Sequence, residues 1–164
     1  MNCIEKIVKR KNSKMNTSNK TRNFSIFWSL FIGIGALLGS LMMFIDPSGE
    51  MWGMTPMLPS FQKLPYPEIF FQNFIFPGIA LLLVNGVTNF ISFILMYQRH
   101  RYATLSAMSC GIILILWITI QFFIFEFNFM STLYFVFGIL QFWTGYRYWK
   151  REKQNEKEMI MKQL

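Results

Sequence analysis

Three acidic side chains are the first candidates for chemistry in this sequence, namely Asp46, Glu50 and Glu126. Each lies at or near the end of a long stretch without formal charge, so a helical assembly could bring Asp46 and Glu126 together at one end. Two carboxylates placed in this way can act as a general acid and a general base. Carboxylates at such positions are also typical of ordinary membrane-surface loops, and we therefore assign no catalytic residue.

A methionine repeat of period three, Met51, Met54 and Met57, is the second candidate. Thioether sulfurs are soft ligands that favour Cu(I). The chain contains 12 methionines in all, however, and methionine is a common apolar filler. The single histidine excludes zinc sites built from several histidines. We expect no metal and no cofactor, with a Cu(I) site at these three methionines as the alternative.

Neutral polar residues within long apolar stretches form the third group. Asn85, Asn89 and Ser92 share one face of a helix. Gln121 and Gln141 lie in two further stretches, and a rise of 1.5 Å per residue places Gln141 at the depth of Asn89. Because polar groups in hydrocarbon turn toward the protein, these five side chains should point into the bundle. They either hold helices together or line a small polar cavity.

Four uncharged stretches must position these residues. The chain is 53% hydrophobic and 18% aromatic, and about 20 apolar residues suffice to span a bilayer. We predict helices over residues 24–45, 74–98, 103–125 and 130–148, because hydrocarbon leaves no partner for an unpaired backbone group. Asn73 is the expected N-cap of the second helix. The predicted fold is all-α, an integral membrane four-helix bundle.

Gly35 and Gly39 in the first helix form a GxxxG pair. Small residues at this spacing let another helix approach closely. The pair predicts either a dimer contact or packing within the bundle.

The basic residues predict the orientation of the chain. Of 16 Lys and Arg residues, all except Lys63 lie before residue 23, at residues 99–101, or after residue 146. Lys and Arg next to membrane helices stay in the cytoplasm. We therefore predict that both termini lie inside and that the chain resides in the cytoplasmic (inner) membrane. The net charge of +8 does not indicate a nucleic-acid binder, because it is concentrated at the chain ends.

The segments outside the four stretches differ in character. Residues 1–23 form a basic tail that we predict to be disordered and able to lie on anionic lipid. Met15 is an alternative start that would remove part of it. Residues 46–73 form an apolar, proline-containing outer loop, and residues 149–164 form a charged cytoplasmic tail.

The order of several motifs resembles a set of small bacterial four-helix integral membrane proteins of uncharacterised function. The motifs are Gly33–Gly39, Asp46-Pro47-Ser48-Gly49, Gly53-Met54, Pro77-Gly78, Trp117 with Gln121, and Gln141. The likeness covers about residues 26–148. It implies a four-helix bundle in a bacterial cytoplasmic membrane and brings no activity with it.

These observations favour a non-enzymatic accessory or assembly protein of the membrane. A small transporter or channel component built around Asn85, Asn89 and Gln141 is one alternative, and a membrane enzyme acting at its outer face is another. The absence of ionisable residues deep in the apolar stretches disfavours an ion-coupled pump. The expected partners are the bilayer, anionic lipid at the basic tails, and a second copy or another membrane protein.

Overall fold

The computed structural model describes residues 3–125 and 129–161, except for the side chains of residues 3–15 and of residue 159. Every element in this part of the chain is helical, which confirms the all-α prediction. The main helices are α1 (Cys3–Ile45), α4 (Ile75–Leu81), the π-helical segment η2 (Leu82–Val87), α5 (Thr88–Tyr97), α6 (Ala103–Phe125) and α7 (Phe129–Ile160). The short helices η1 (Thr55–Met57), α2 (Leu58–Phe61) and α3 (Pro67–Phe70) lie between α1 and α4.

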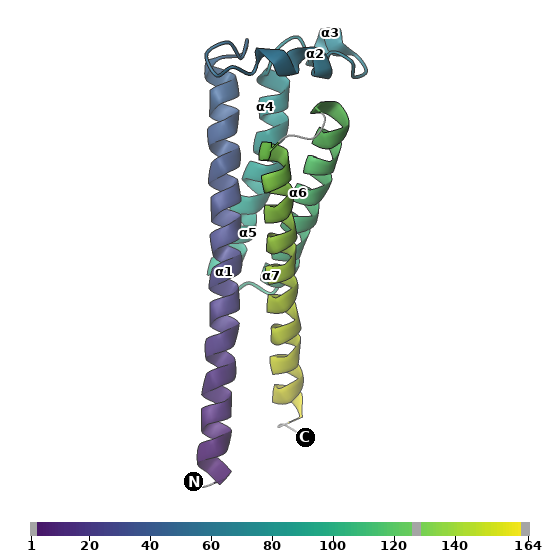
Figure 1. Cartoon of the computed structure of the whole chain (residues 1–164). Helices are drawn as coiled ribbons and strands as arrows, with labels where there is room; N and C mark the ends of the chain where they lie inside the picture. Colours follow the sequence, from purple (N-terminus) through teal and green to yellow (C-terminus); the bar gives the residue numbers. More distant parts are fainter. Residues whose placement is uncertain (1–2, 126–128, 162–164) are drawn as a thin grey trace.

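The main helices form an up-and-down bundle (Figure 1). Helix α1 runs up to the loop that holds η1, α2 and α3, and the continuous unit of α4, η2 and α5 runs back. Helix α6 then runs toward the same loop, and α7 returns beside α6 and α1. We call the end covered by residues 46–74 the loop end, and the opposite end, where both chain termini lie, the terminal end.

Three helices within the described residues are long and apolar enough to cross a membrane, over Asn16–Ile45, Ile75–Tyr97 and Ala103–Phe125. Helix α7 is not among them. Its upper half carries Ser131, Gln141 and Thr144 among its apolar residues, and these lower its mean hydropathy. The bundle is thus confirmed as helical with three candidate spans.

The predicted helix boundaries are right in the middle of the chain and wrong at its ends. Helix α6 begins and ends at the predicted residues, whereas α1 begins at Cys3 and α7 continues to Ile160. Residues 3–23, which we predicted to be disordered, are therefore helical. No Pro or Gly precedes Gly33, and lengthening an existing helix needs no new nucleus. The extended parts also contact each other, because Arg151 Nη1 donates hydrogen bonds to Thr17 O and Thr21 Oγ1.

The start of α4 is joined to the start of the loop. Its N-cap is Phe74 rather than the predicted Asn73, but Asn73 Oδ1 still accepts a hydrogen bond from Ile75 N at 3.0 Å. Phe74 N donates to Pro47 O at 2.9 Å. Because free N–H groups at a helix start need acceptors, these two bonds anchor the loop to the bundle.

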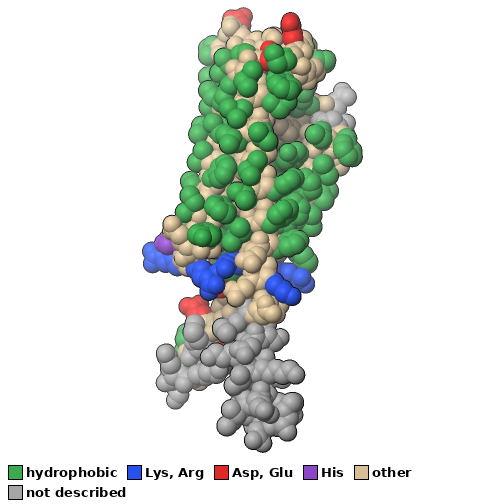
Figure 2. Space-filling view, turned by 90° about the vertical axis from the view of Figure 1, so that its left-hand side faces the viewer, with side chains coloured by type: hydrophobic (Ala, Val, Ile, Leu, Met, Phe, Trp, Pro, Cys, Tyr) green, Lys and Arg blue, Asp and Glu red, His purple; other side chains and the backbone are tan. Residues whose placement is uncertain are grey.

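Polar side chains gather inside the bundle and large aliphatic ones outside it. The buried polar residues include Ser25, Ser29, Ser40, Asn85, Asn89, Ser92, Gln141 and Thr144. By contrast, Leu38 on α1, Leu83 on η2 and Leu116 on α6 are 56%, 56% and 58% exposed. Figure 2 shows hydrophobic side chains covering the body of the molecule, with acidic groups at the loop end and basic groups below the apolar zone. A water-soluble bundle has the opposite arrangement.

The closest backbone approach joins α6 and α7 and not the predicted GxxxG pair. A Cβ atom added to Gly111 would lie 2.5 Å from Phe142 N, and one added to Gly145 would lie 2.9 Å from Met108 N. At Gly35 and Gly39 the nearest atoms are the hydroxyl of Tyr134 and a methyl group of Leu81, at 3.0 and 3.1 Å. The GxxxG pair therefore packs within the bundle, and a dimer contact there stays a prediction.

We expect Gly111→Ala to destabilise the protein by about 1–3 kcal/mol, the usual cost of overpacking a core. The added methyl group would meet the backbone of Phe142, which can move only if α6 and α7 separate. Gly33→Ala is the matched control, because its nearest neighbours lie at an ordinary 3.5 Å and alanine favours the helix. Chemical unfolding in detergent measures both; equal stability of the two variants would contradict this packing.

Candidate functional site

A hydrogen-bonded polar group joins three helices in the middle of the bundle. Gln141 Nε2 on α7 donates to Asn89 Oδ1 on α5 at 2.6 Å and to Ser29 Oγ on α1 at 3.2 Å. All three side chains are at most 1% exposed, and we call them the amide cluster. The contact between Gln141 and Asn89 is the one that their equal depth predicted. The cluster therefore links α7 to α1 and α5 through side-chain hydrogen bonds.

The π-helical segment η2 lies one turn before the amide cluster. Single π turns inside α-helices bond each carbonyl to the N–H five residues on, and they are frequent at functional sites. Side chains also bond the carbonyl groups here: Asn89 Nδ2 donates to Asn85 O at 2.8 Å. Cys110 Sγ on α6 lies 3.4 Å from Thr88 O, the next residue after η2. The segment is thereby held by its neighbours.

The side chain of Asn85 is buried without satisfying its own amide group. It is 1% exposed, and neither Nδ2 nor Oδ1 has a hydrogen-bond partner among the described residues. A buried amide in this state is costly, and such groups in proteins are otherwise rare. Asn85 is therefore the most unusual of the predicted polar residues.

The predicted polar residues other than Asn85 separate into three places. Asn89 and Gln141 belong to the amide cluster. Ser92 Oγ lies nearer the terminal end, 3.3 Å from Ser106 Oγ on α6. Gln121 lies toward the loop end, where its Oε1 accepts a hydrogen bond from Ser131 Oγ at 3.4 Å.

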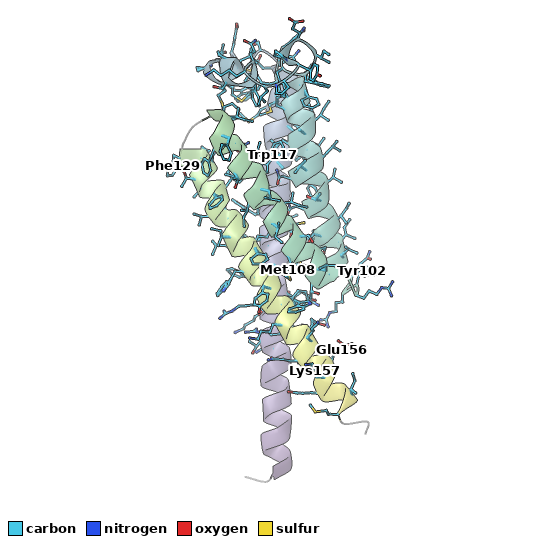
Figure 3. All side chains as sticks on the ribbon, turned by 90° about the vertical axis from the view of Figure 1, so that its right-hand side faces the viewer. Tyr102, Met108, Trp117, Phe129, Glu156 and Lys157 are labelled. Carbon is cyan, nitrogen blue, oxygen red and sulfur yellow. The ribbon has the colours of Figure 1, made fainter. Side chains whose placement is uncertain are left out.

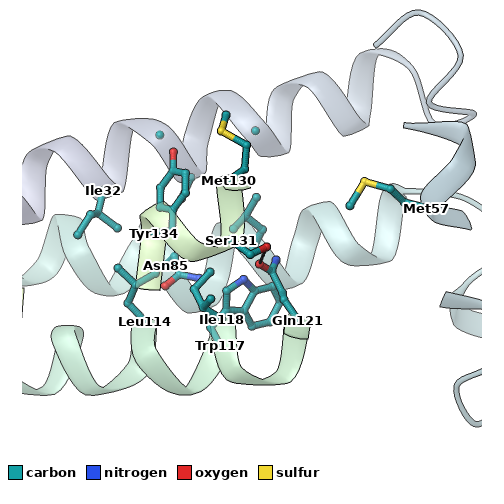
Figure 4. Close-up of a pocket in the computed structure, with 14 residues that line it drawn as sticks. Ile32, Met57, Asn85, Leu114, Trp117, Ile118, Gln121, Met130, Ser131 and Tyr134 are labelled. Carbon is teal, nitrogen blue, oxygen red and sulfur yellow. Dashed lines mark hydrogen bonds between the residues drawn. The ribbon is translucent and has the colours of Figure 1, made fainter. Parts of the chain in front are cut away.

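A cavity of about 250 Å³ opens beside Asn85, between α1, η2, α6 and α7. We call it the Asn85 cavity. Its polar groups come from Asn85, Trp117, Gln121, Ser131 and Tyr134, and the rest of its wall is apolar. Figure 4 shows Asn85, Trp117 and Gln121 following one another along the cavity toward the loop end. Trp117 Nε1 is buried and, within the described part of the chain, also lacks a partner.

A second cavity of about 230 Å³ lies closer to the loop end. We call it the phenylalanine cavity, because five of its lining residues are Phe61, Phe71, Phe74, Phe76 and Phe125. The two cavities share the lining residues Met57, Leu81, Trp117 and Gln121, so they adjoin. Figure 3 places Trp117 on α6 toward the loop, far from Tyr102 at the other end of the helix.

The outer carboxylates do not form a site with these cavities. Asp46 and Glu50 line neither cavity, and Glu126 lies outside the described residues. Both carboxylate oxygens of Asp46 serve the turn that follows α1: Ser48 Oγ donates to Oδ1 at 2.6 Å, and Met51 N donates to Oδ2 at 2.7 Å.

The methionine repeat is likewise divided. Met51 is 70% exposed at the surface, whereas Met57 lines both cavities. A Cu(I) site at the three methionines stays a prediction. No group of three or more His, Cys, Asp or Glu side chains that could hold a metal occurs in the part of the chain that the structure describes.

Sequence reasoning did not identify several residues of this region. Ser29 completes the amide cluster, and Met57 and Tyr134 line the Asn85 cavity. Ser25 and Ser29, four residues apart in an apolar stretch, mark a polar face of the first helix that could have been found. Met57 was predicted only as a Cu(I) candidate, and its place in the cavity could not have been found, because it reaches the cavity from the loop.

Comparison with known protein families, with curated proteins and with solved structures finds no significant match to this chain. The geometry described above therefore carries the functional argument.

We expect Asn89→Leu and Gln141→Leu to be coupled in a double-mutant cycle. Interhelical hydrogen bonds in membrane proteins contribute about 0.6 kcal/mol on average and up to about 1.7 kcal/mol, and the cycle should give an energy in this range. Ser40→Ala is the control, because Ser40 Oγ bonds Ala36 O within α1 at 2.7 Å. Its removal should add independently to that of Gln141. Additivity of Asn89→Leu with Gln141→Leu would show that the bond contributes nothing.

We expect Asp46 to make loop stability depend on pH. The hydrogen bond from Ser48 is the main reason that the pKa of Asp46 lies below its usual value of 3.8; loss of hydration opposes it, and the N–H groups of Met51, Gly49 and Ser48 reinforce it. A carboxyl with a lowered folded-state pKa stabilises the protein above its unfolded pKa, and this contribution is lost as the pH falls through the folded value.

Asp46→Asn should therefore lower the melting temperature at neutral pH, and the difference from the wild type should shrink as the pH falls below 3.8. Asparagine has only one oxygen with which to accept the bonds from Ser48 and Met51. Glu50→Gln, in the same loop and exposed, is the control. A melting difference for Asp46→Asn that stays constant from neutral pH to below 3.8 would contradict this role.

Proposed function

We propose that this chain is a four-span protein of the cytoplasmic membrane, with both termini inside the cell, that acts as a non-enzymatic accessory protein. The observation that carries the proposal is the inverted distribution of side chains. Neutral polar residues occupy the interior, while Leu38, Leu83 and Leu116 on the outside of the bundle are more than half exposed. This arrangement is costly in water and favourable in lipid.

The terminal end supports a cytoplasmic assignment. It combines basic residues with aromatic rings in cation–π contacts: Arg101 lies 4.5 Å from the ring of Tyr102, and Arg147 lies 4.1 Å from the ring of Trp143. Aromatic rings and basic residues are typical of the inner membrane boundary. Figure 2 shows the basic groups gathered just below the apolar surface. The loop end instead carries Asp46, Glu50 and Glu68, with Lys63 as its basic residue.

Helix α7 supports a fourth span although its mean hydropathy is lower. It packs along α6 and α1, and its polar residues Gln141 and Thr144 are 1% and 4% exposed. Val136, Ile139 and Trp143 on the same helix are 45%, 45% and 48% exposed. The face that α7 presents to its surroundings is therefore apolar, which favours its placement in lipid.

The two alternative functions receive less support from the geometry. The amide cluster packs tightly on the terminal side of the Asn85 cavity, where a pathway through the bundle would have to run. An enzyme at the outer face would need free carboxylates, but those of Asp46 are held in a turn. An accessory protein with a binding chamber in its outer half fits both observations. Membership in the small bacterial four-helix membrane proteins that the sequence resembles is part of the proposal.

The number of spans can be tested by cysteine labelling, which shows on which side of the membrane each end of the chain lies. In a chain carrying Cys3→Ser and Cys110→Ser, we expect Asn16→Cys and Lys150→Cys to resist a membrane-impermeant maleimide in intact cells. Met51→Cys, exposed at the loop end, should react. All three positions should react in permeabilised membranes, which serves as the control. Labelling of only one of Asn16→Cys and Lys150→Cys in intact cells would show an odd number of spans and overturn the proposal.

A further inference from the structure

We propose that the Asn85 cavity and the phenylalanine cavity together bind a neutral long-chain alcohol that dissolves in the membrane. Its hydroxyl group lies against Asn85 and Trp117, and its chain lies among the phenylalanines. This inference rests on the proposed membrane location, because only a bilayer supplies such a molecule at high concentration.

The hydrogen-bonding groups left over in the protein match a hydroxyl group. Asn85 Nδ2 and Trp117 Nε1 are buried donors and Asn85 Oδ1 is a buried acceptor, and all three lack a partner among the described residues. Both residues line the Asn85 cavity (Figure 4). A hydroxyl group accepts and donates at once, so it can accept from Trp117 Nε1 and donate to Asn85 Oδ1. A ketone or quinone oxygen can only accept and would leave the acceptor unpaired.

The absence of charge indicates that the ligand is neutral. Neither cavity has an Asp, Glu, Lys, Arg or His among the described residues that line it. A carboxylate or phosphate placed there would be buried without a counter-charge, which is strongly unfavourable. Ionised fatty acids and phospholipid headgroups therefore do not fit beside Asn85.

The volumes favour one ligand that occupies both cavities. Small-molecule sites usually measure about 300–1,000 Å³. The Asn85 cavity at about 250 Å³ and the phenylalanine cavity at about 230 Å³ each fall below this range. The two cavities adjoin at Met57, Leu81, Trp117 and Gln121, and their combined volume exceeds this lower limit. Water molecules could satisfy Asn85, but they would not fill an apolar chamber walled by phenylalanine.

Photocrosslinking of the full chain in lipid nanodiscs tests the proposal. The probe is a hexadecanol derivative with a diazirine in its chain, and unlabelled hexadecanol, hexadecane and palmitic acid are the competitors. We expect crosslinks to lining residues of the phenylalanine cavity, and hexadecanol should compete at least about tenfold better than the other two, the factor that one hydrogen bond provides. Equal competition by hexadecane would overturn the proposal, since it would show that the hydroxyl group is not recognised.

Trp117→Phe removes the indole N–H and keeps an aromatic ring, so it should weaken hexadecanol binding about tenfold. Trp28→Phe is the matched control, because Trp28 Nε1 is also buried without a partner among the described residues but lines neither cavity. It should leave hexadecanol binding unchanged. Equal loss in both variants, or no loss in Trp117→Phe, would contradict the site.

Asn85→Leu distinguishes a site that binds an alcohol from a site that holds water. If the amide is empty without alcohol, leucine should raise the melting temperature of the alcohol-free protein and abolish the advantage of hexadecanol over hexadecane. A lower melting temperature with unchanged hexadecanol binding would show that water occupies the site, and the proposal would be wrong. When Asn85→Leu is combined with Met51→Cys, maleimide labelling in intact cells should match that of Met51→Cys alone. A failed ligand site is then distinguishable from a failed membrane topology.

Discussion

A polar side chain in hydrocarbon has no water to bond, and the interior of this bundle is arranged around that constraint. Gln141 Nε2 satisfies it by reaching Asn89 and Ser29 on two other helices, while Gln141 Oε1 has no partner among the described residues. Hydroxyl groups on single helices satisfy it locally, as when Ser40 Oγ donates to Ala36 O. Only the first kind of bond carries information about tertiary structure. The bonds of Gln141 therefore tie α7 to α1 and α5 in the middle of the bundle.

The same constraint makes Asn85 conspicuous. Its backbone carbonyl receives the side chain of Asn89, so the backbone of η2 is well supported. Its own amide is turned into a cavity and is unsatisfied by the described residues. A π turn inserts one extra residue into a helix and thereby redirects a side chain. Here the turn separates Asn85 from the amide cluster that begins one helical turn later. Two asparagines one turn apart thus differ in role: Asn89 makes a structural hydrogen bond, and the side chain of Asn85 has no partner among the described residues.

The sequence predicts the helices better than it predicts the site. Residues 103–125 lie between a basic turn and an acidic one, so both boundaries of α6 follow from charge. The start of α1 does not follow from charge, because a charged helix can continue into water wherever the backbone allows it. The hydrogen bond from Arg151 to Thr17 stabilises that continuation. Equal depth along the two helices was enough to predict the contact between Gln141 and Asn89. The unpaired state of Asn85 depends on a π turn, for which the sequence contains no recognisable signal.

Close packing shows the same limit. Gly35 and Gly39 have the familiar motif spacing, yet side chains fill the space opposite them. Gly111 and Gly145 belong to different helices, and no spacing rule within one helix connects them. Gly111 faces the backbone of Phe142 and Gly145 faces that of Met108, because α6 and α7 are consecutive helices that run antiparallel. Close approach of two helices is thus set by chain connectivity, which single-helix motifs ignore.

Helix α7 shows why average hydropathy underestimates an inner helix. A mean over its residues counts Gln141 and Thr144 as if they faced lipid, although both are buried. In the proposed four-span arrangement lipid would meet only the outer face, where Val136 and Ile139 are exposed. The more polar groups a helix contributes to the interior, the less apolar it looks as a whole. The helix on which the amide cluster most depends is therefore the one that composition alone is least able to place in a membrane.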